Sequence, residues 1–265
     1  MGVFTKITLQ ELNSLFPSYG FTKIIATVSG IIDTTYIVFS EQEGYILKKY
    51  ERDIPDKISQ DTALLKHLND VGLNVPLCID KKDDWYLYTK LKGAQPHNVK
   101  SYHIQALGRF LASLHRHTSH IKCDSNIKVD KEVLLALKYT KKYHFSYYKK
   151  FEFLKDFTHT DNNLIHGDIF KDNTIFDDRK IGVIDFIDST YGSYSFDAAV
   201  ALIGFDVRVH HHYLINTFLI AYNQHSSKKL NKKELLANMK TASHFYALKR
   251  VYNYKNIFEA KELLR

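Results

Sequence analysis

Apolar and polar residues alternate with the two-residue period of β-strands in several short runs near the start of the chain. These runs cover residues 23–28, 35–39, 45–50, 77–80 and 85–90. Between them, apolar residues at helical spacing predict one helix from the N-cap Thr8 to Phe16 and a second over residues 56–71. The first three strands follow one another closely, so we expect them to form an antiparallel meander.

After residue 100 the pattern becomes mainly helical. From Ser101 onward, Ile104, Leu107, Leu111 and Leu114 form an apolar stripe along one helix. Further helices are predicted within 131–157, from an N-cap at Ser195, over 210–224 and from 232 to the end. The exception is a hairpin, in which a polar turn at 177–180 separates the strands 174–176 and 181–184.

Composition bounds the protein class and its partners. The chain has 265 residues, of which 45% are apolar and 25% charged, as in a globular protein of one large or two small domains. The net charge of +8 comes from scattered lysines without a nucleic-acid motif, so we expect no nucleic-acid partner. The longest apolar run, 198–205, is too short to span a membrane, and Cys78 and Cys123 have no disulfide or metal-ligand spacing. We therefore expect a cytoplasmic protein without a membrane partner.

The strongest chemical signal is the stretch LIHGDIFKDNTIFDDRKIGVIDF at residues 164–186. Asn173 follows Asp168 after four intervening residues, and Asp185 comes at the end of the second hairpin strand. Kinases use this spacing for an aspartate base and for two ligands of Mg²⁺, with an arginine where this chain has Gly167. A plain hairpin with a polar loop is the alternative. The offset of Asn173 and the later Asp-Phe pair favour a kinase active site.

The segments LIHGDIFKDN and GVIDFIDSTYGSYSFDAAVAL resemble the aminoglycoside phosphotransferase and choline kinase superfamily. The opening MGVFTKIT, the GLNVP segment and the C-terminal FYALKRVYNY resemble homoserine kinases of that fold. The resemblance covers nearly the whole chain. It implies an α+β, bilobal protein-kinase-like fold, with a nucleotide-binding antiparallel sheet and helix in an N-lobe, 1–92, and a helical C-lobe, 93–265, that carries the catalytic hairpin. It also implies phosphorylation of a small-molecule hydroxyl, with ATP and Mg²⁺ as cofactors.

Lys48 lies where kinases carry a strand lysine that pairs with the α- and β-phosphates of the nucleotide. Alternation places Ile46 and Lys48 on one face of the strand, and Lys48 would enter the cleft if Ile46 faces the core. Kinases orient this lysine with a helix glutamate, and the matching position here is Asp61. The alternatives are a solvated lysine beside Lys49 and a solvated helix carboxylate.

Two backbone segments are predicted to contact the nucleotide. The turn between the first two strands would lie over the phosphates, where Gly30, Ser29 and Thr34 offer N–H and hydroxyl groups, although it is alternatively a simple hairpin turn. The backbone from Thr89 to Leu91 is predicted to face the adenine, because an edge strand exposes unpaired N–H and C=O groups.

Other polar residues are expected to support the site. We expect His166 to hold the catalytic loop through hydrogen bonds, and the resemblance implies that Asp197 braces the same loop from below. Histidine clusters at 115–120 and 210–212 follow or precede helices without cysteine or carboxylate partners. We therefore predict no zinc site at either cluster.

The charges of the acceptor decide which residues its binding site needs. Homoserine carries a carboxylate as well as an ammonium group, so its site needs a cation beside an acidic group. The predicted loop 188–195 supplies Asp188 and Tyr191, and Arg208 or Arg250 is the candidate cation, unless each is a surface residue. Choline, ethanolamine or an amino sugar, which need acidic or aromatic walls, form the alternative class of acceptor.

Two other classes of protein share parts of this motif. A protein kinase is not expected, because no Ala-Pro-Glu follows Asp185 and the third residue of Asp-Phe-Gly is Ile187 here. A pseudokinase that binds nucleotide without turnover is the alternative of another class. The presence of Asp168, Asn173 and Asp185 together argues against it.

Overall fold

The structure, a computed structural model, describes the chain except for residues 1–3, 28–31, 42, 122–130, 159–160 and 265. The chain divides into two compact units. The first consists of Met1–Gly93 together with Gly182–Ile187, and the second of Ala94–Ile181 together with Asp188–Arg265. Gly182–Ile187, which the sequence pattern grouped with the C-terminal part, therefore belongs to the first unit.

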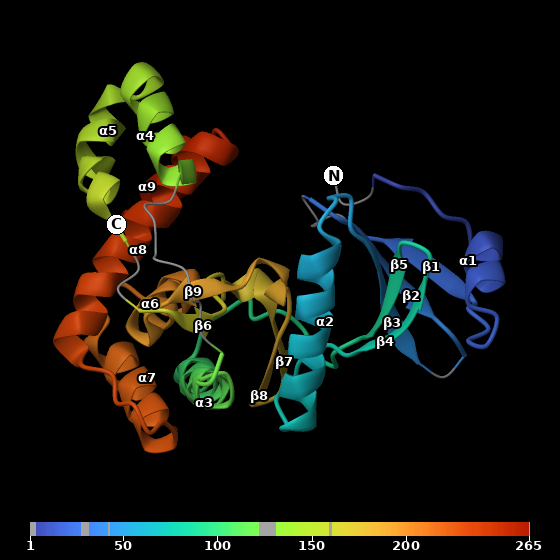
Figure 1. The fold of residues 1–265 in the computed structure, drawn as a ribbon. Helices are drawn as coiled ribbons and strands as arrows, with labels where there is room; N and C mark the ends of the chain where they lie inside the picture. The colour runs from blue at the N-terminus through green and yellow to red at the C-terminus, as the bar shows by residue number, and fades with distance from the viewer. Residues whose placement is uncertain (1–3, 28–31, 42, 122–130, 159–160, 265) are drawn as a thin grey trace. The chain divides into compact units, whose positions relative to one another are not determined.

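The first unit is built on a five-stranded antiparallel sheet with the order β1-β2-β3-β5-β4 (Figure 1). Its strands are β1 (Lys23–Ala26), β2 (Thr34–Phe39), β3 (Gly44–Lys49), β4 (Cys78–Lys82) and β5 (Trp85–Thr89). The register pairs Ile24 with Val38 and Val38 with Tyr45. The predicted meander of the first three strands is confirmed.

Helix α1 (Leu9–Leu15) covers one face of this sheet. Thr8 caps it as predicted, and the capping box with Glu11 satisfies backbone donors at the helix start. Leu12 packs with buried residues of the sheet, among them Leu47 of β3. Leu47 is fully buried whereas Ile46 is half-buried, so the face that carries Ile46 and Lys48 points away from the α1 core.

Helix α2 (Pro55–Asp70) lies on the opposite face (Figure 1). A small cluster of Tyr50, Ile58 and Ile187 is buried on this side. Ile187 belongs to the segment that joins the first unit from the second half of the chain, so this cluster helps to anchor that segment.

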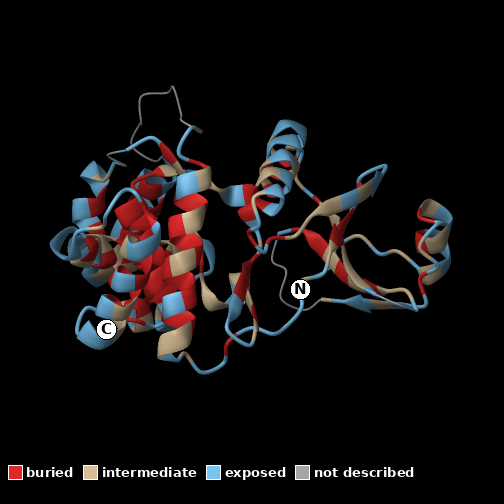
Figure 2. Cartoon of the chain, turned by 90° about the horizontal axis from the view of Figure 1, so that it is seen from below, coloured by how far each residue is buried: buried red, intermediate tan, exposed pale blue. Residues whose placement is uncertain are grey.

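The second unit is mainly helical. Its helices are α3 (Ser101–His117), α4 (Lys131–Tyr143), α5 (Phe145–Phe151), α6 (Tyr194–Gly204), α7 (His212–His225), α8 (Lys232–Asn253) and α9 (Ile257–Leu263). The predicted stripe on α3 is buried, and every residue of α6 is buried. Figure 2 shows these buried residues gathered in the helices of this unit. A Cβ on Gly108 of α3 would lie 2.8 Å from the backbone oxygen of Phe218 in α7, so close packing of these helices requires glycine.

Short strands and single turns carry the polar loops. Strands β7 (Thr174–Asp177) and β8 (Lys180–Val183) form the predicted hairpin. Strands β6 (Asn163–Ile165) and β9 (Thr190–Gly192) pair with each other. The 3₁₀ turns are η1 (Glu152–Asp156), η2 (Lys171–Asn173) and η3 (Phe186–Asp188).

Three expectations for the second half were wrong. Residues 188–195 are not one loop, because β9 pairs with β6 within that range. Ser193, not Ser195, caps α6 by accepting the Phe196 N–H at 3.0 Å. The helix predicted from residue 232 to the end stops at Asn253, because Lys255 adopts a left-handed φ of 53° before α9 begins. Among the described helices, none has both the length and the apolar character needed to cross a membrane.

Candidate active site

The predicted catalytic loop, residues 166–173, follows β6 and ends in η2. Its two predicted functional residues lie together in the second unit, where Nδ2 of Asn173 donates to the backbone oxygen of Asp168 at 2.8 Å and to Oδ2 at 3.2 Å. Because the amide nitrogen is used in this way, the amide oxygen of Asn173 is the group available to a cation. The pair therefore suits a base held beside a metal ligand.

Gly167 precedes Asp168 and needs to be glycine. Its φ is 74°, in the left-handed region, and an added Cβ would lie 3.2 Å from Cγ2 of Thr190. The Gly167 carbonyl accepts a hydrogen bond from the hydroxyl of Tyr246 on α8. Burial, with the charges of Asp168 and Asp197, raises the pKa of Tyr246 well above its ordinary value, so this hydroxyl remains a donor.

Asp197 supports the loop from α6. Its Oδ1 accepts the Gly167 N–H at 2.8 Å and its Oδ2 accepts the His166 N–H at 3.1 Å. His115 Nε2 lies 3.0 Å from Oδ2. Burial opposes ionisation of Asp197, but the hydrogen bond and charge of His115, the charge of His166 and the Gly167 N–H outweigh it and lower the pKa of the carboxyl. The fully buried carboxylate thus holds two successive backbone N–H groups ahead of Asp168.

His115 and Tyr246 are parts of this network that the sequence motifs did not indicate. His115 stacks on Tyr194 with ring centroids 4.1 Å apart, and its Nδ1 lies 2.8 Å from the hydroxyl of Tyr222. The available signal was a polar residue beside the buried stripe of α3, since His115 follows Leu114 and lies one turn after Leu111. His166, which was predicted to hold the loop, accepts the Asp168 N–H on its Nδ1 at 3.2 Å.

In the first unit, Lys48 lies between two carboxylates. Its Nζ is 3.3 Å from Oδ1 of Asp185 and 3.9 Å from Oδ2 of Asp33, and it lies over the ring of Tyr50. Asp185 follows β8, whose Val183 N–H donates to the carbonyl of Asn74 at 3.1 Å. This places the strand lysine and the Asp of Asp-Phe in contact across 137 residues of sequence.

The side chain of Asp185 is partly exposed, and its backbone adopts an uncommon conformation. Its side chain is 45% exposed, and its φ of 68° is a left-handed conformation that few non-glycine residues adopt. Among the described residues, no cluster of three or more histidine, cysteine, aspartate or glutamate side chains has the arrangement of a metal site. Mg²⁺ prefers oxygen ligands, and the residues present fit this preference in each unit by itself, with the carboxylate of Asp185 in the first and the amide oxygen of Asn173 in the second.

The predicted nucleotide-binding residues Asp61 and Thr34 both lie buried in the first unit. Asp61 is part of α2. The Thr34 hydroxyl is fully buried, where it accepts the N–H groups of Phe4 and Thr5 and donates to Glu51 at 2.5 Å. It is therefore used within the unit and not presented to a phosphate. Ser29 and Gly30 lie outside the described residues.

The prediction that the backbone from Thr89 to Leu91 faces the adenine assumed that this strand is an edge strand, and this assumption is wrong. Strand β5 is not an edge strand, because it lies between β3 and β4 in the sheet. The Thr89 N–H already donates to the Leu77 carbonyl at 2.9 Å. Leu91 packs close to Gly182, whose added Cβ would lie 2.7 Å from Leu91 Cδ1.

The two candidate arginines have different surroundings. The guanidinium of Arg208 donates to the carbonyls of Ile203 at 3.2 Å and Glu262 at 3.1 Å, so it joins the end of α6 to α9. Arg250 lies over the ring of Phe170, a residue of the catalytic loop, and pairs with Glu259 at 3.2 Å.

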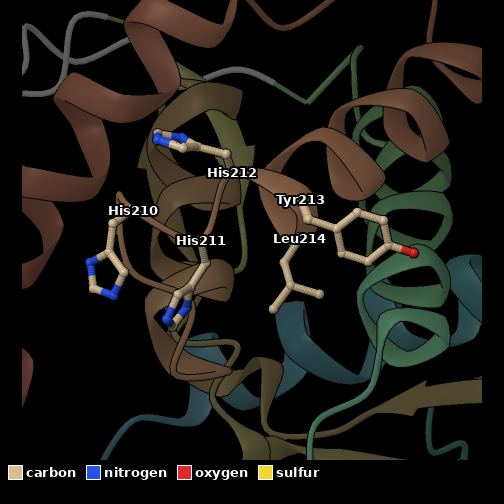
Figure 3. Close-up of a pocket in the computed structure, with 5 residues that line it drawn as sticks. All are labelled: His210, His211, His212, Tyr213 and Leu214. Carbon is tan, nitrogen blue, oxygen red and sulfur yellow. The ribbon is translucent and has the colours of Figure 1, made fainter.

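The remaining predicted acceptor residues and the histidine cluster are near the surface. Asp188 is exposed at the end of η3, and Tyr191 is half-buried in β9 opposite Leu164. Residues 210–214 line a shallow pocket of about 400 Å³ (Figure 3). In this view the rings of His210, His211 and His212 do not converge on one point.

Comparison with known proteins identifies the family and the fold. A family model described as "Phosphotransferase enzyme family" matches residues 23–225. The chain is similar to homoserine kinases of Granulibacter bethesdensis, with 26% identity over 97% of this chain and 90% of the relative, and of Methylobacillus flagellatus, with 24% identity over 76% and 70%. Among solved structures it resembles the amicoumacin kinase hAmiN in complex with AMP-PNP, Ca²⁺ and Ami, with a TM-score of 0.64 and 17% identity over 93% of this chain and 83% of that one. The predicted kinase-like α+β fold is confirmed.

Proposed function

The chain belongs to the phosphotransferase enzyme family, and we propose that it transfers the γ-phosphate of ATP to the hydroxyl of L-homoserine, giving O-phosphohomoserine. The transfer of phosphate to a hydroxyl is the activity of this family. The homoserine kinases among its relatives, and the arrangement of charged side chains described above, support the choice of this acceptor.

We assign Asp168 as the base that orients the acceptor hydroxyl and takes its proton. Phosphoryl transfer passes through a loose transition state, so the enzyme contributes mainly by positioning and by neutralising charge. The contacts around Asp168 suit that task. Asn173 holds the side chain and the backbone oxygen of Asp168, and Asp197 holds the two preceding N–H groups.

Asn173 and Asp185 are the proposed ligands of Mg²⁺, which neutralises charge on the nucleotide phosphates when it is bound. Lys48 is proposed to pair with the α- and β-phosphates. Its position beside Asp185 supports this role, because a lysine and a metal carboxylate then act on the same phosphate chain. The similar kinase hAmiN forms a complex with a nucleotide analogue and a divalent cation, which supports the same pair of cofactors here.

The position of Arg250 is the observation that carries the choice of acceptor. An anionic group of the substrate needs a cation next to the catalytic loop, and Arg250 lies over Phe170 of that loop, two residues after Asp168. Arg208 is already used by backbone carbonyls. The exposed carboxylate of Glu259, which pairs with Arg250, supplies the acidic group that an ammonium needs.

The test is phosphorylation by the purified full chain with ATP and Mg²⁺, followed by ³¹P NMR of the products. The acceptors are L-homoserine, choline, ethanolamine and an aminoglycoside, with a blank that lacks an acceptor. We expect O-phosphohomoserine as the product and turnover confined to homoserine. Turnover confined to a cationic acceptor would overturn the choice of substrate. No turnover with any acceptor, by a protein that binds ADP, would indicate a pseudokinase.

A further inference from the structure

Lys48 pairs with two carboxylates, and the proposed mechanism gives only one of them another role. Asp185 is the proposed metal ligand and is 45% exposed. Asp33 is only 6% exposed and directly precedes β2. Both carboxylates are within 4 Å of the Lys48 ammonium group, at 3.3 and 3.9 Å.

Asp33 is held rigidly by the residues that follow β3. Its Oδ1 accepts the Glu51 N–H at 3.1 Å, and its Oδ2 accepts from the Arg52 guanidinium at 3.1 Å. Next to it, the buried Thr34 hydroxyl bonds to Glu51. A buried carboxyl group that accepts from a backbone N–H and a guanidinium has a fixed position, so it can hold a lysine at a fixed point.

The sheet register explains why these residues meet. Thr35 of β2 lies opposite Lys48 of β3, and Thr34 lies opposite Lys49. Asp33 therefore stands at the start of β2 while Lys48 approaches the end of β3. Side chains from neighbouring antiparallel strands reach each other at this separation.

We propose that Asp33 is a positioning residue that holds Lys48 for the nucleotide phosphates. The proposal rests on the nucleotide-binding role of Lys48 in the proposed function. Asp33 acts through Lys48 and does not itself touch the substrate. Because Asp185 binds the metal in the proposed mechanism, Asp33 is the carboxylate that stays with Lys48 when both cofactors are present.

The test is the affinity of Asp33→Asn for ADP, measured by titration calorimetry in EDTA. Asparagine keeps an oxygen for the Glu51 N–H but removes the charge that holds Lys48. We expect about a tenfold higher Kd for ADP, as for the loss of one partner of a partly buried charge pair. Thermal unfolding of the same sample reports whether the fold is intact.

A matched variant isolates the contact. Asp84→Asn removes the carboxylate that lies 4.0 Å from Lys49, the residue after Lys48, on the other face of β3. The Asp84 side chain is 81% exposed, so the Kd of this variant for ADP should change less than about twofold. A wild-type Kd in Asp33→Asn, or an equal loss in Asp84→Asn, would overturn the proposal.

A third variant covers the case in which Asp33→Asn does not fold. Arg52→Gln keeps the Asp33 carboxylate and its bond to the Glu51 N–H but removes the guanidinium donor, so the Kd for ADP should rise by less than about threefold. A loss of affinity of about tenfold in Arg52→Gln would mean that Asp33 serves to clamp Arg52, and the proposal would fail. The measurement needs neither metal nor acceptor, so a wild-type protein that is inactive on the acceptor panel would contradict the proposed function without changing the outcome of this test.

Discussion

The guanidinium groups of Arg208 and Arg250 have different partners. Arg208 donates to two backbone carbonyls and lies 3.6 Å from Asp206, so it stabilises the ends of helices. The side chain of Arg250 is 24% exposed and stacks on Phe170 and Tyr254. The sequence named both as candidates, because residue type shows charge and not the partners of that charge.

At the residue scale, replacing Arg250 by methionine tests the acceptor site. Methionine keeps much of the apolar stem and removes the cation, so the KM for homoserine should rise about ten- to a hundredfold, as expected for one lost charge-assisted hydrogen bond. The KM for ATP should stay within about twofold. Steady-state kinetics with each substrate varied in turn measures both constants.

Lys249→Met is the matched control for this prediction. Lys249 neighbours Arg250 on α8 but pairs with Glu132 of α4 at 3.8 Å. Its replacement should leave both constants unchanged. An unchanged KM for homoserine in Arg250→Met, or equal changes in the two variants, would remove Arg250 from the acceptor site.

At the scale of elements, the first turn of α6 and the last turn of α3 meet beneath the catalytic loop. Asp197 comes from α6 and His115 from α3, and the short pair of β6 and β9 delivers the loop to them. The apolar stripe predicted α3 and the hairpin signal predicted β7 and β8. Strand β9 was missed because three residues, Thr190–Gly192, carry little periodicity and pair with β6 more than twenty residues earlier.

Asp197→Asn tests this arrangement through its pH dependence. The pKa of Asp197 is lowered from its ordinary value of 3.8, so its charge stabilises the fold above about pH 3.8 and this contribution is lost as the pH falls below that value. At pH 7 the variant should lose about 3 kcal/mol of unfolding free energy, as when one partner of a buried charged pair is removed. The gap to the wild type should narrow below pH 3.8.

Urea unfolding of both proteins between pH 7 and pH 3 measures this gap. Asp178→Asn is the control, because Asp178 is exposed in the β7–β8 turn at a φ of 53° that asparagine also tolerates. It should change the free energy of unfolding by less than about 0.5 kcal/mol at every pH. A gap for Asp197→Asn that does not change with pH would mean that its charge does not stabilise the loop.

For the whole molecule, the proposed machinery is divided between the two units. Lys48, Asp33 and Asp185 belong to the first, and Asp168 and Asn173 to the second. Sequence motifs identified four of these five residues because each motif has a fixed spacing. Asp33 has no such motif, since its contact with Lys48 follows from the register of β2 and β3.

No sequence pattern predicted that Gly182–Ile187 belongs to the first unit. It depends on contacts with residues about a hundred positions earlier. The Val183 N–H bonds to Asn74, an added Cβ on Gly182 would meet Asn74 Nδ2 at 2.6 Å, and Ile187 packs with Ile58. A motif names Asp185 but carries no information on these partners.

The most direct test of the account is the turnover of Asp168→Asn, measured together with its affinity for ADP. Asparagine cannot accept the proton of the hydroxyl, so kcat should fall by about a thousandfold or more, whereas the Kd for ADP should stay within about twofold. Asp172→Asn, an exposed neighbour in the same loop, should retain wild-type turnover. Turnover of Asp168→Asn within about tenfold of the wild type would contradict the assignment of Asp168 as the base.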